Sequence, residues 1–384
     1  MDAIFIFILI VITQTLVTKN VSKRFKILSE NYVWTMFAVH CILTATYITY
    51  AFITTSDAFG YFARSSRAED WLSLWGTSTT FIDFVGWPFT HLIGLSFIST
   101  MFIFSYFGYL AILFFYIAAK ENVSLQPVWK KYTPVELVFL LPNLHFWSAS
   151  FGKGSVILLG LGMFCLGLSR FNRRYFTMLA GGFIVYMVRP HILFAVVISV
   201  MLSAMLTSKG IKWYLRWIIF AVSMVLIIYI GQDVAKFTSV EDFDVLNSEF
   251  ISNRAAELSK STSGINIQNY SLPMKMFTFW FRPLFFDGLG MMGLIVSFEN
   301  LFYLFMFWVV VYNGFKNWKN WNGYFRICLF IFLLGSLALA QVTGNLGIAI
   351  RQKAQLMPFF FIIYFKSLQF RQSISKTKIA GYAK

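Results

Sequence analysis

The sequence predicts an all-α protein, a polytopic transmembrane helix bundle of about 11 spans, from its composition and its apolar runs. Of the 384 residues, 58% are hydrophobic, 20% are aromatic and only 12% are charged. Soluble domains contain about 25% charged residues. The composition therefore excludes a soluble globular enzyme, a disordered chain, a collagen and a disulfide scaffold.

The apolar runs define the predicted spans, because a helix needs roughly 20 mostly apolar residues to cross a bilayer. They lie at 3–18, 32–54, 98–118, 134–149, 154–169, 175–188, 192–207, 213–231, 299–315, 325–341 and 354–367. Two further stretches, 81–97 and 276–297, are interrupted by Gly, Pro and charge. We expect them to be re-entrant or interfacial helices on the outer side. The first run follows Asp2 and no basic residue, so we expect it to remain as a helix.

The distribution of charge predicts the orientation. If the N-terminus is outside, 21 of the 32 basic residues and only 3 of the 16 acidic residues fall on inside connections. Every inside connection is then basic, as the positive-inside rule requires. We expect one transmembrane domain over 1–384 with its N-terminus outside and a basic cytoplasmic tail at 367–384. The net charge of +16 is thus explained by topology, and we expect membrane lipids but no nucleic acid as partners.

Neither a cofactor nor a metal is expected. The three cysteines all fall in predicted spans, and the four histidines are far apart in the sequence. No metal-ligand spacing and no glycine-rich phosphate-binding motif occurs.

The longest outside connection, 232–275, contains a predicted amphipathic cap helix over Glu241–Lys260. Apolar residues recur in it at near-helical spacing, and its acidic residues come early, as the helix dipole favours. Long ordered loops often serve as lids or binding elements. The alternative is a cover helix without a chemical role.

Three arginines stand at predicted membrane borders: Arg189, Arg282 and Arg351. A charge inside the hydrocarbon costs about 2.5–3.5 kcal/mol, so such residues either reach out to the interface or face a partner in the bundle. Guanidinium groups match the geometry of phosphate oxygens. Together with Lys153 and Lys353 on the same side, the three arginines predict a site for phosphate or pyrophosphate.

Candidate acids and bases lie near the same outer side. Asp57 stands at the mouth of a span and is the first candidate for a general base; Asp83, inside an apolar segment, is the second. His145 belongs to a polar cluster that ends at Lys153. That cluster either satisfies itself inside a helical hairpin or lines a polar cavity, in which His145 would deprotonate a hydroxyl. Asp287 is expected to pair with Arg282.

Five short motifs resemble those of the bacterial polysaccharide polymerases, the Wzy and EpsG-like multispanning proteins of O-antigen and exopolysaccharide synthesis. They are Ser56-Asp57-Ala-Phe-Gly-Tyr61, Pro142-Asn-Leu-His-Phe-Trp-Ser-Ala-Ser-Phe-Gly-Lys153, Arg189-Pro-His191, Phe281-Arg-Pro283 and Gly344-Asn-Leu-Gly with Arg351-Gln-Lys353. An acid on the first large outer loop is also similar to the membrane glycosyltransferases of the GT-C type, although only Asp57 stands where many of those have paired acids.

The resemblance implies an enzyme of the bacterial inner membrane that joins oligosaccharide repeat units carried on undecaprenyl pyrophosphate, together with other polysaccharide assembly proteins. The arginines would bind the diphosphate and offset the charge of the leaving group. The candidate catalytic residues are Asp57, Asp83 and His145. The candidate substrate-binding residues are Tyr61, Lys153, Arg189, His191, Arg282, Arg351 and Lys353.

Three other functions stay open at this point. A lipid-linked sugar flippase or transporter would use the same arginines, but such folds often contain internal repeats, and no half-to-half similarity is evident. A glycan-modifying enzyme, a ligase or an acyltransferase, would draw on His145 or His191. A scaffold for a secretion complex would leave the three border arginines unexplained.

Overall fold

The computed structural model describes residues 1–54, 56–206, 212–237, 264–267, 269–288 and 290–382. In these residues the chain is helical, and β-structure is limited to two isolated bridges. Most of the 232–275 connection, including the expected cap helix at Glu241–Lys260, lies outside the described residues. The fold class predicted from the sequence, an all-α polytopic membrane protein, agrees with this structure.

Seven helices in the described residues are long and apolar enough to cross a membrane, or eight if one bent pair is a single span. The seven are α1 (Asp2–Arg24), α2 (Glu30–Ile53), α5 (Phe97–Asn122), α11 (Trp213–Phe237), α14 (Gly290–Val309), α15 (Gly323–Val342) and α16 (Leu346–Tyr382). All 11 apolar runs fall on helices, but several are short. The run at 134–149 is divided between two helices that each begin at a proline, which favours the first turn of a helix.

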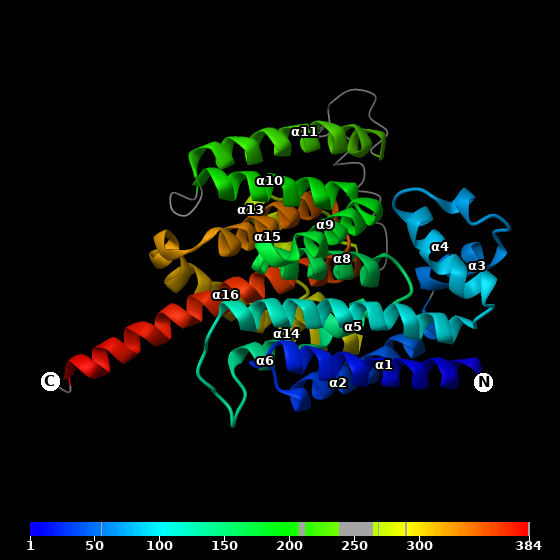
Figure 1. Cartoon of the computed structure of the whole chain (residues 1–384), viewed down its shortest axis with the longest axis horizontal. Coiled ribbons are helices and arrows are strands. Elements are labelled where there is room, and N and C mark those ends of the chain that lie inside the picture. The colour runs from blue at the N-terminus through cyan, green and yellow to red at the C-terminus, as the bar shows by residue number, and fades with distance from the viewer. Residues whose placement is uncertain (55, 207–211, 238–263, 268, 289, 383–384) are drawn as a thin grey trace. The chain divides into compact units, whose positions relative to one another are not determined.

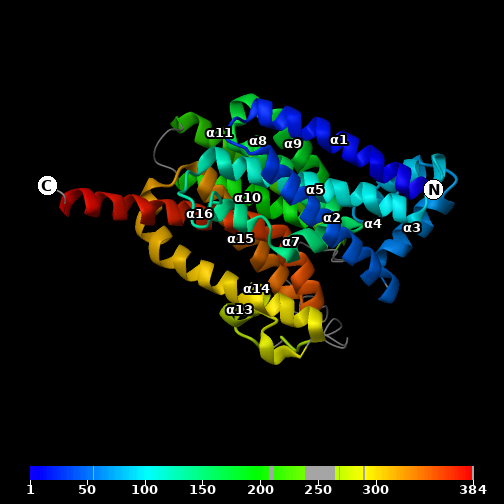
Figure 2. The same cartoon turned by 90° about the horizontal axis from the view of Figure 1, so that it is seen from below.

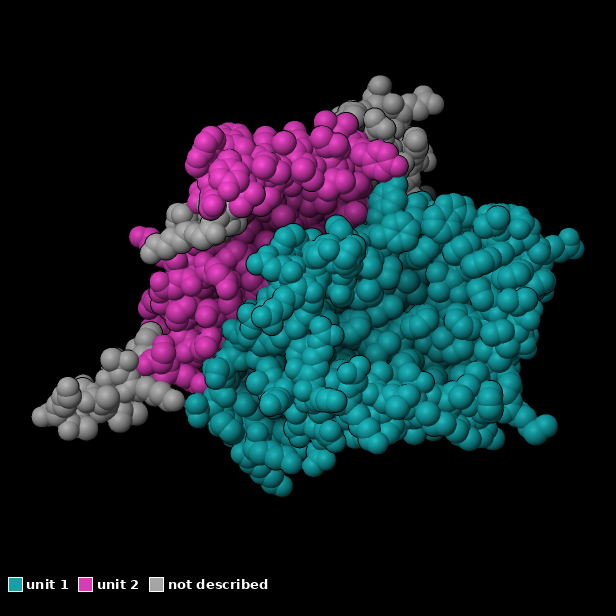
Figure 3. All heavy atoms as spheres, in the orientation of Figure 1, with its two compact units in different colours: residues 1–189 teal, residues 190–384 magenta. Residues whose placement is uncertain are grey.

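The chain forms two compact units, Met1–Arg189 and Pro190–Lys384, which are coloured separately in Figure 3. In unit 1, α1, α2 and α5 lie side by side (Figures 1 and 2). The buried Gln14 side chain of α1 donates to the Tyr109 hydroxyl of α5 at 2.7 Å. The Asp2 carboxylate accepts hydrogen bonds from Ser96 and Ser99 at the start of α5. Polar contacts therefore fix both the register and one end of this layer.

Four further helices of unit 1 follow α5 in the chain, and two of them, α8 and α9, pack through glycines. The four are α6 (Pro134–Val138), α7 (Pro142–Ser148), α8 (Lys153–Ser169) and α9 (Phe171–Val188). A Cβ atom on Gly162 of α8 would lie 2.7 Å from the carbonyl oxygen of Ala111 on α5, and one on Gly181 of α9 would lie 2.5 Å from that of Gly160. Such contacts let backbones approach closely, as small residues do between membrane helices. We call the contacts of Gly160, Gly162 and Gly181 the glycine seam.

One end of unit 1 is built from short helices at the side of the chain's N-terminus (Figures 1 and 2). These are α3 (Asp57–Arg67), η1 (Leu72–Leu74), α4 (Thr79–Trp87) and η2 (Pro88–Leu92). The Trp71 ring stacks on Phe84 and Trp87, and Trp75 is 54% exposed. Tryptophans of this kind are typical of a membrane–water interface. We refer to this region as the α3–α4 end.

In unit 2, α10 (Pro190–Leu206) packs against α11 and α15, and α15 packs against α16 and α13 (Leu272–Phe281). Trp280 and Phe360 each stack on Phe332, which places aromatic rings between α13, α15 and α16. The short elements are η3 (Phe285–Asp287), η4 (Val310–Gly314) and η5 (Phe315–Asn320). The stretch 276–297 becomes the end of α13, η3 and the start of α14, and the basic tail continues α16 as helix to Tyr382.

Candidate functional site

Five of the residues predicted from the sequence gather at the α3–α4 end of unit 1. Asp57 and Tyr61 lie on α3, Asp83 on α4, Lys153 at the start of α8, and Arg189 directly after α9. Lys153 interacts electrostatically with both acids and with Arg189. Residues far apart in the sequence thus form one cluster of mixed charge, which we call the α3–α4 cluster.

Arg64 holds Asp83 inside this cluster. Its Nε and Nη2 atoms donate to the two carboxylate oxygens of Asp83 at 2.7 and 3.2 Å, and its guanidinium lies over the Tyr61 ring. Asp83 is 2% exposed, whereas Asp57 is exposed. Burial raises the pKa of the Asp83 carboxyl, and the hydrogen bonds from Arg64 oppose that shift. Asp83 therefore has a structural partner on both oxygens, and Asp57 is the better placed acid to meet a substrate.

Tyr61 interacts electrostatically with both Asp57 and Asp83. Burial raises the pKa of its phenol, and the negative charge of Asp57 adds to that effect. At neutral pH Tyr61 is consequently a neutral hydroxyl that donates and accepts hydrogen bonds. Arg64 was not among the residues selected from the sequence. Its position one helical turn after Tyr61 on the same face was the available signal.

Lys153 links three elements of unit 1. Its Nζ atom donates to the Ser78 hydroxyl at 2.7 Å, and the Ser78 N–H donates to the carbonyl oxygen of Met187 at 2.7 Å. The loop before α4, the start of α8 and the end of α9 are thereby tied together. Sequence reasoning missed Ser78, for which the only signal is a Gly-x-Ser tripeptide in the loop before α4.

His145 lies elsewhere, inside the helices of unit 1. It is 0% exposed; its Nδ1 lies 3.0 Å from Nδ1 of His40, and its Nε2 contacts the Phe139 carbonyl oxygen at 2.8 Å. Ser148 donates to the Leu144 carbonyl oxygen. His145 and Ser148 thus make their hydrogen bonds inside unit 1, as the first of the two alternatives for this polar cluster expects, whereas Lys153 contacts Ser78. Both ring nitrogens of His145 are occupied, so we do not retain it as a general base.

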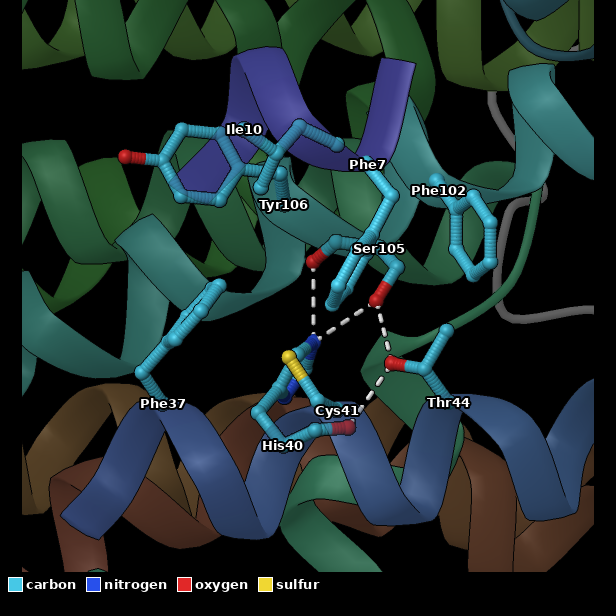
Figure 4. Close-up of a pocket in the computed structure, with 9 residues that line it drawn as sticks. All are labelled: Phe7, Ile10, Phe37, His40, Cys41, Thr44, Phe102, Ser105 and Tyr106. Carbon is cyan, nitrogen blue, oxygen red and sulfur yellow. Dashed lines mark hydrogen bonds between the residues drawn. The ribbon is translucent and has the colours of Figure 1, made fainter. Parts of the chain in front are cut away.

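A small cavity adjoins the histidine pair (Figure 4). Its volume is about 30 Å³, and His40, Cys41, Thr44 and Ser105 form its polar side. His40 contacts Ser105, which in turn contacts Thr44, as the dashed lines of Figure 4 mark. A water molecule needs about 10–15 Å³ when a cavity volume counts only the space open to the centre of a water-sized sphere. The cavity therefore suits one or two waters and excludes a sugar.

In unit 2, Arg282 and Asp287 form the expected ion pair. Arg282 Nε lies 3.1 Å from Oδ1 and 3.2 Å from Oδ2 of Asp287, and the Leu284 N–H donates to Oδ2 at 2.7 Å. The loop after α13 is thus held together by hydrogen bonds to the Asp287 carboxylate. The Asp287 carboxylate thereby occupies the side of the Arg282 guanidinium that the sequence suggested for a phosphate.

Lys353 is fully buried beneath this loop. Its Nζ atom donates to the Trp280 carbonyl oxygen at 3.2 Å, the Arg282 carbonyl oxygen at 3.0 Å and Asn300 Oδ1 at 2.6 Å. Asn300 in turn donates to the Pro283 carbonyl oxygen. All three ammonium donors are used within the protein, so Lys353 positions the Arg282 loop and does not reach a substrate from this place.

The three border arginines divide between the units. Arg189 ends unit 1, whereas Arg282 and Arg351 belong to unit 2, where Arg351 and His191 are both half-buried. A single cavity formed by all three arginines stays a prediction. In the part of the chain that the structure describes, no group of three or more His, Cys, Asp or Glu side chains is arranged to hold a metal ion.

No family model, no curated protein and no solved structure matches this chain. The chemistry of the two units therefore carries the functional argument.

The Arg282–Asp287 pair predicts how stability depends on pH. Burial alone would raise the pKa of Asp287, but the hydrogen bonds from Arg282 and the Leu284 N–H outweigh it, and the pKa is lowered. The carboxylate therefore stabilises the fold above its unfolded pKa of about 4, and that contribution is lost as pH falls through the lower folded value. We expect Asp287→Asn to flatten the acid side of a melting-temperature profile below about pH 5. An unchanged slope would contradict this assignment.

Proposed function

We propose that this chain is a membrane glycosyltransferase that polymerises oligosaccharide repeat units carried on undecaprenyl pyrophosphate. The observation that carries the proposal is the α3–α4 cluster. It brings an exposed acid, Asp57, together with a neutral phenol, Tyr61, and a cation, Arg189, at one end of a set of membrane helices. Glycosyl transfer from a lipid diphosphate needs a proton acceptor and a cation at a membrane border.

Each group has a role in the proposed step. The hydroxyl oxygen of the acceptor sugar attacks the anomeric carbon of the donor, and the bond from that carbon to the pyrophosphate oxygen breaks. Asp57 accepts the hydroxyl proton. Arg189 offsets the negative charge that grows on the departing pyrophosphate, as fixed cations do best in a transition state. Tyr61 and the Arg64–Asp83 pair hold the wall of the site.

The proposal includes a location and a topology. We place the protein in the bacterial inner membrane with its N-terminus and the α3–α4 end outside and its C-terminus in the cytoplasm. Two features support this: the charge distribution, and the exposed tryptophans of the α3–α4 end. The finer count of about 11 spans belongs to this proposal as well.

Deletion of the gene, followed by a gel of the surface glycan, tests the function. Loss of long chains with single repeat units retained is the expected result. Unchanged chain length would refute the polymerase. Loss of the single units too would favour a flippase, because transport precedes polymerisation.

A further inference from the structure

Ser78 has a backbone conformation that is rare for its residue type. It immediately precedes α4 with φ of 67° and ψ of −116°. A residue with a Cβ atom rarely has positive φ outside the compact left-handed region, and such positions are strained. Strained residues of this kind cluster at functional sites, because the surrounding structure must enforce them.

The hydroxyl of Ser78 does not perform the usual task of a serine at this position. Serine before a helix normally accepts a hydrogen bond from an N–H of the first turn. All residues of α4 are described, and the Ser78 side chain caps none of their N–H groups. Its hydroxyl lies instead 2.7 Å from Lys153 Nζ.

The turn around Ser78 brings the residues before and after it close together. A Cβ atom on Gly76 would lie 2.5 Å from Thr80 Oγ1, so the residues two before and two after Ser78 meet. The segment reads Gly76-Thr-Ser78-Thr-Thr80. In serine hydrolases, a strained Gly-x-Ser-x-Gly turn that opens a helix exposes the nucleophile. This segment shares the Gly-x-Ser part of that turn and has Thr80 at the last position.

Lys153 is placed to act on this hydroxyl. It is half-buried and stands among other charges, with Arg189 and Arg64 as cations and Asp57 and Asp83 as anions. Serine and lysine form nucleophile–base pairs on several unrelated folds. The N–H of Thr79, the first residue of α4, belongs to the helix end whose N–H groups lack intrahelical partners. An oxyanion formed at Ser78 would meet that N–H.

We propose that Ser78 and Lys153 are the nucleophile and the base of an acyl-transfer site for carboxylic esters. Neutral Lys153 accepts the Ser78 proton while Oγ forms a bond to the ester carbonyl carbon. The tetrahedral intermediate then expels the alcohol, which takes the proton from Lys153, and an acyl-serine remains. Water or a sugar hydroxyl attacks that ester with Lys153 again as base, which releases the acyl group and restores the Ser78 hydroxyl.

This activity is separate from glycosyl transfer and uses atoms that the proposed polymerase step does not need. Its substrate class is an ester, such as an O-acyl group on a glycan that reaches the α3–α4 end. Covalent labelling reports on Ser78, whereas the glycan gel reports on chain length. Either proposal can therefore fail without the other.

The test is reaction of the full-length protein, purified in detergent, with a fluorophosphonate probe, followed by mass spectrometry of the Ser78 peptide. We expect an adduct on Ser78 whose rate of formation rises with pH as Lys153 loses its proton. Ser78→Gly tolerates positive φ and removes the hydroxyl, so labelling should vanish while the melting temperature holds or rises. Lys153→Arg should slow labelling by about 10²–10⁴-fold.

Ser73→Ala is the matched control. Ser73 lies in the same loop, and its hydroxyl donates to the Asp70 carbonyl oxygen at 2.6 Å. We expect it to label like the wild type. A folded protein whose Ser78 peptide is recovered without an adduct would overturn the proposal. So would equal labelling of Ser73, or a labelling rate that Lys153→Arg leaves unchanged.

Discussion

Replacement of Asp57 by Asn is expected to lower glycan polymerisation by about 10²–10⁴-fold, the usual contribution of a general base. Asp57 is exposed at the first position of α3, where the helix dipole favours a negative charge. The substitution removes the proton acceptor while keeping the size of the side chain. The measurement is the chain-length distribution of surface glycan in a deletion strain complemented with the variant, with the protein level checked in membranes.

Two further acids serve as comparisons for Asp57. Asp70 accepts hydrogen bonds from the N–H groups of Leu72 and Ser73 in the same region, so Asp70→Asn should leave polymer length unchanged. Asp83→Asn removes the partner of Arg64 and should lower both stability and polymer length. Normal chain length in Asp57→Asn would remove Asp57 from the mechanism.

Replacement of Lys353 by Met should cost about 1–3 kcal/mol of stability for each buried acceptor that it leaves without a hydrogen bond. The substitution orphans the carbonyl oxygens of Trp280 and Arg282 and the amide oxygen of Asn300. It also removes the electrostatic interaction of Lys353 with the buried Glu299. The measurement is thermal unfolding in detergent, followed by tryptophan fluorescence.

Lys319→Met is the matched control for Lys353, because Lys319 is exposed on η5 in the same unit. It should melt within a degree or two of the wild type, as surface substitutions usually change stability by less than about 0.5 kcal/mol. Equal melting temperatures for both variants would show that the buried ammonium contributes nothing to the fold.

The helices could be predicted from the sequence because each apolar run averages hydropathy over many residues. Every predicted run falls on a helix, and the proline at 142 marks a real break. The number of spans was less predictable, since α10 has only 17 residues and the pair α7 and α8 bends by 114°. Length and composition do not reveal whether such a bent segment crosses a membrane.

The cluster was partly predictable for a different reason. Asp57, Asp83 and Lys153 stand out because charges in apolar surroundings are rare. Lys353 stood out equally, yet it is buried and its Nζ atom is hydrogen-bonded to carbonyl oxygens of the protein. Ser78 did not stand out at all, because a serine in a polar loop becomes unusual only through its φ angle. Charge is visible in a sequence, whereas backbone strain and hydrogen-bond partners are not.

The glycine seam gives the α3–α4 end a fixed spacing. Lys153 begins α8 and Arg189 follows α9, and the two helices meet at Gly160 and Gly181 with backbone against backbone. Sliding one past the other would require an atomic overlap that no side-chain rotation relieves. The distance between Lys153 and Arg189 is thus set by the contact in the middle of the two helices. A ligand that binds both residues must match that distance, and any closure around it must come from α3 and α4.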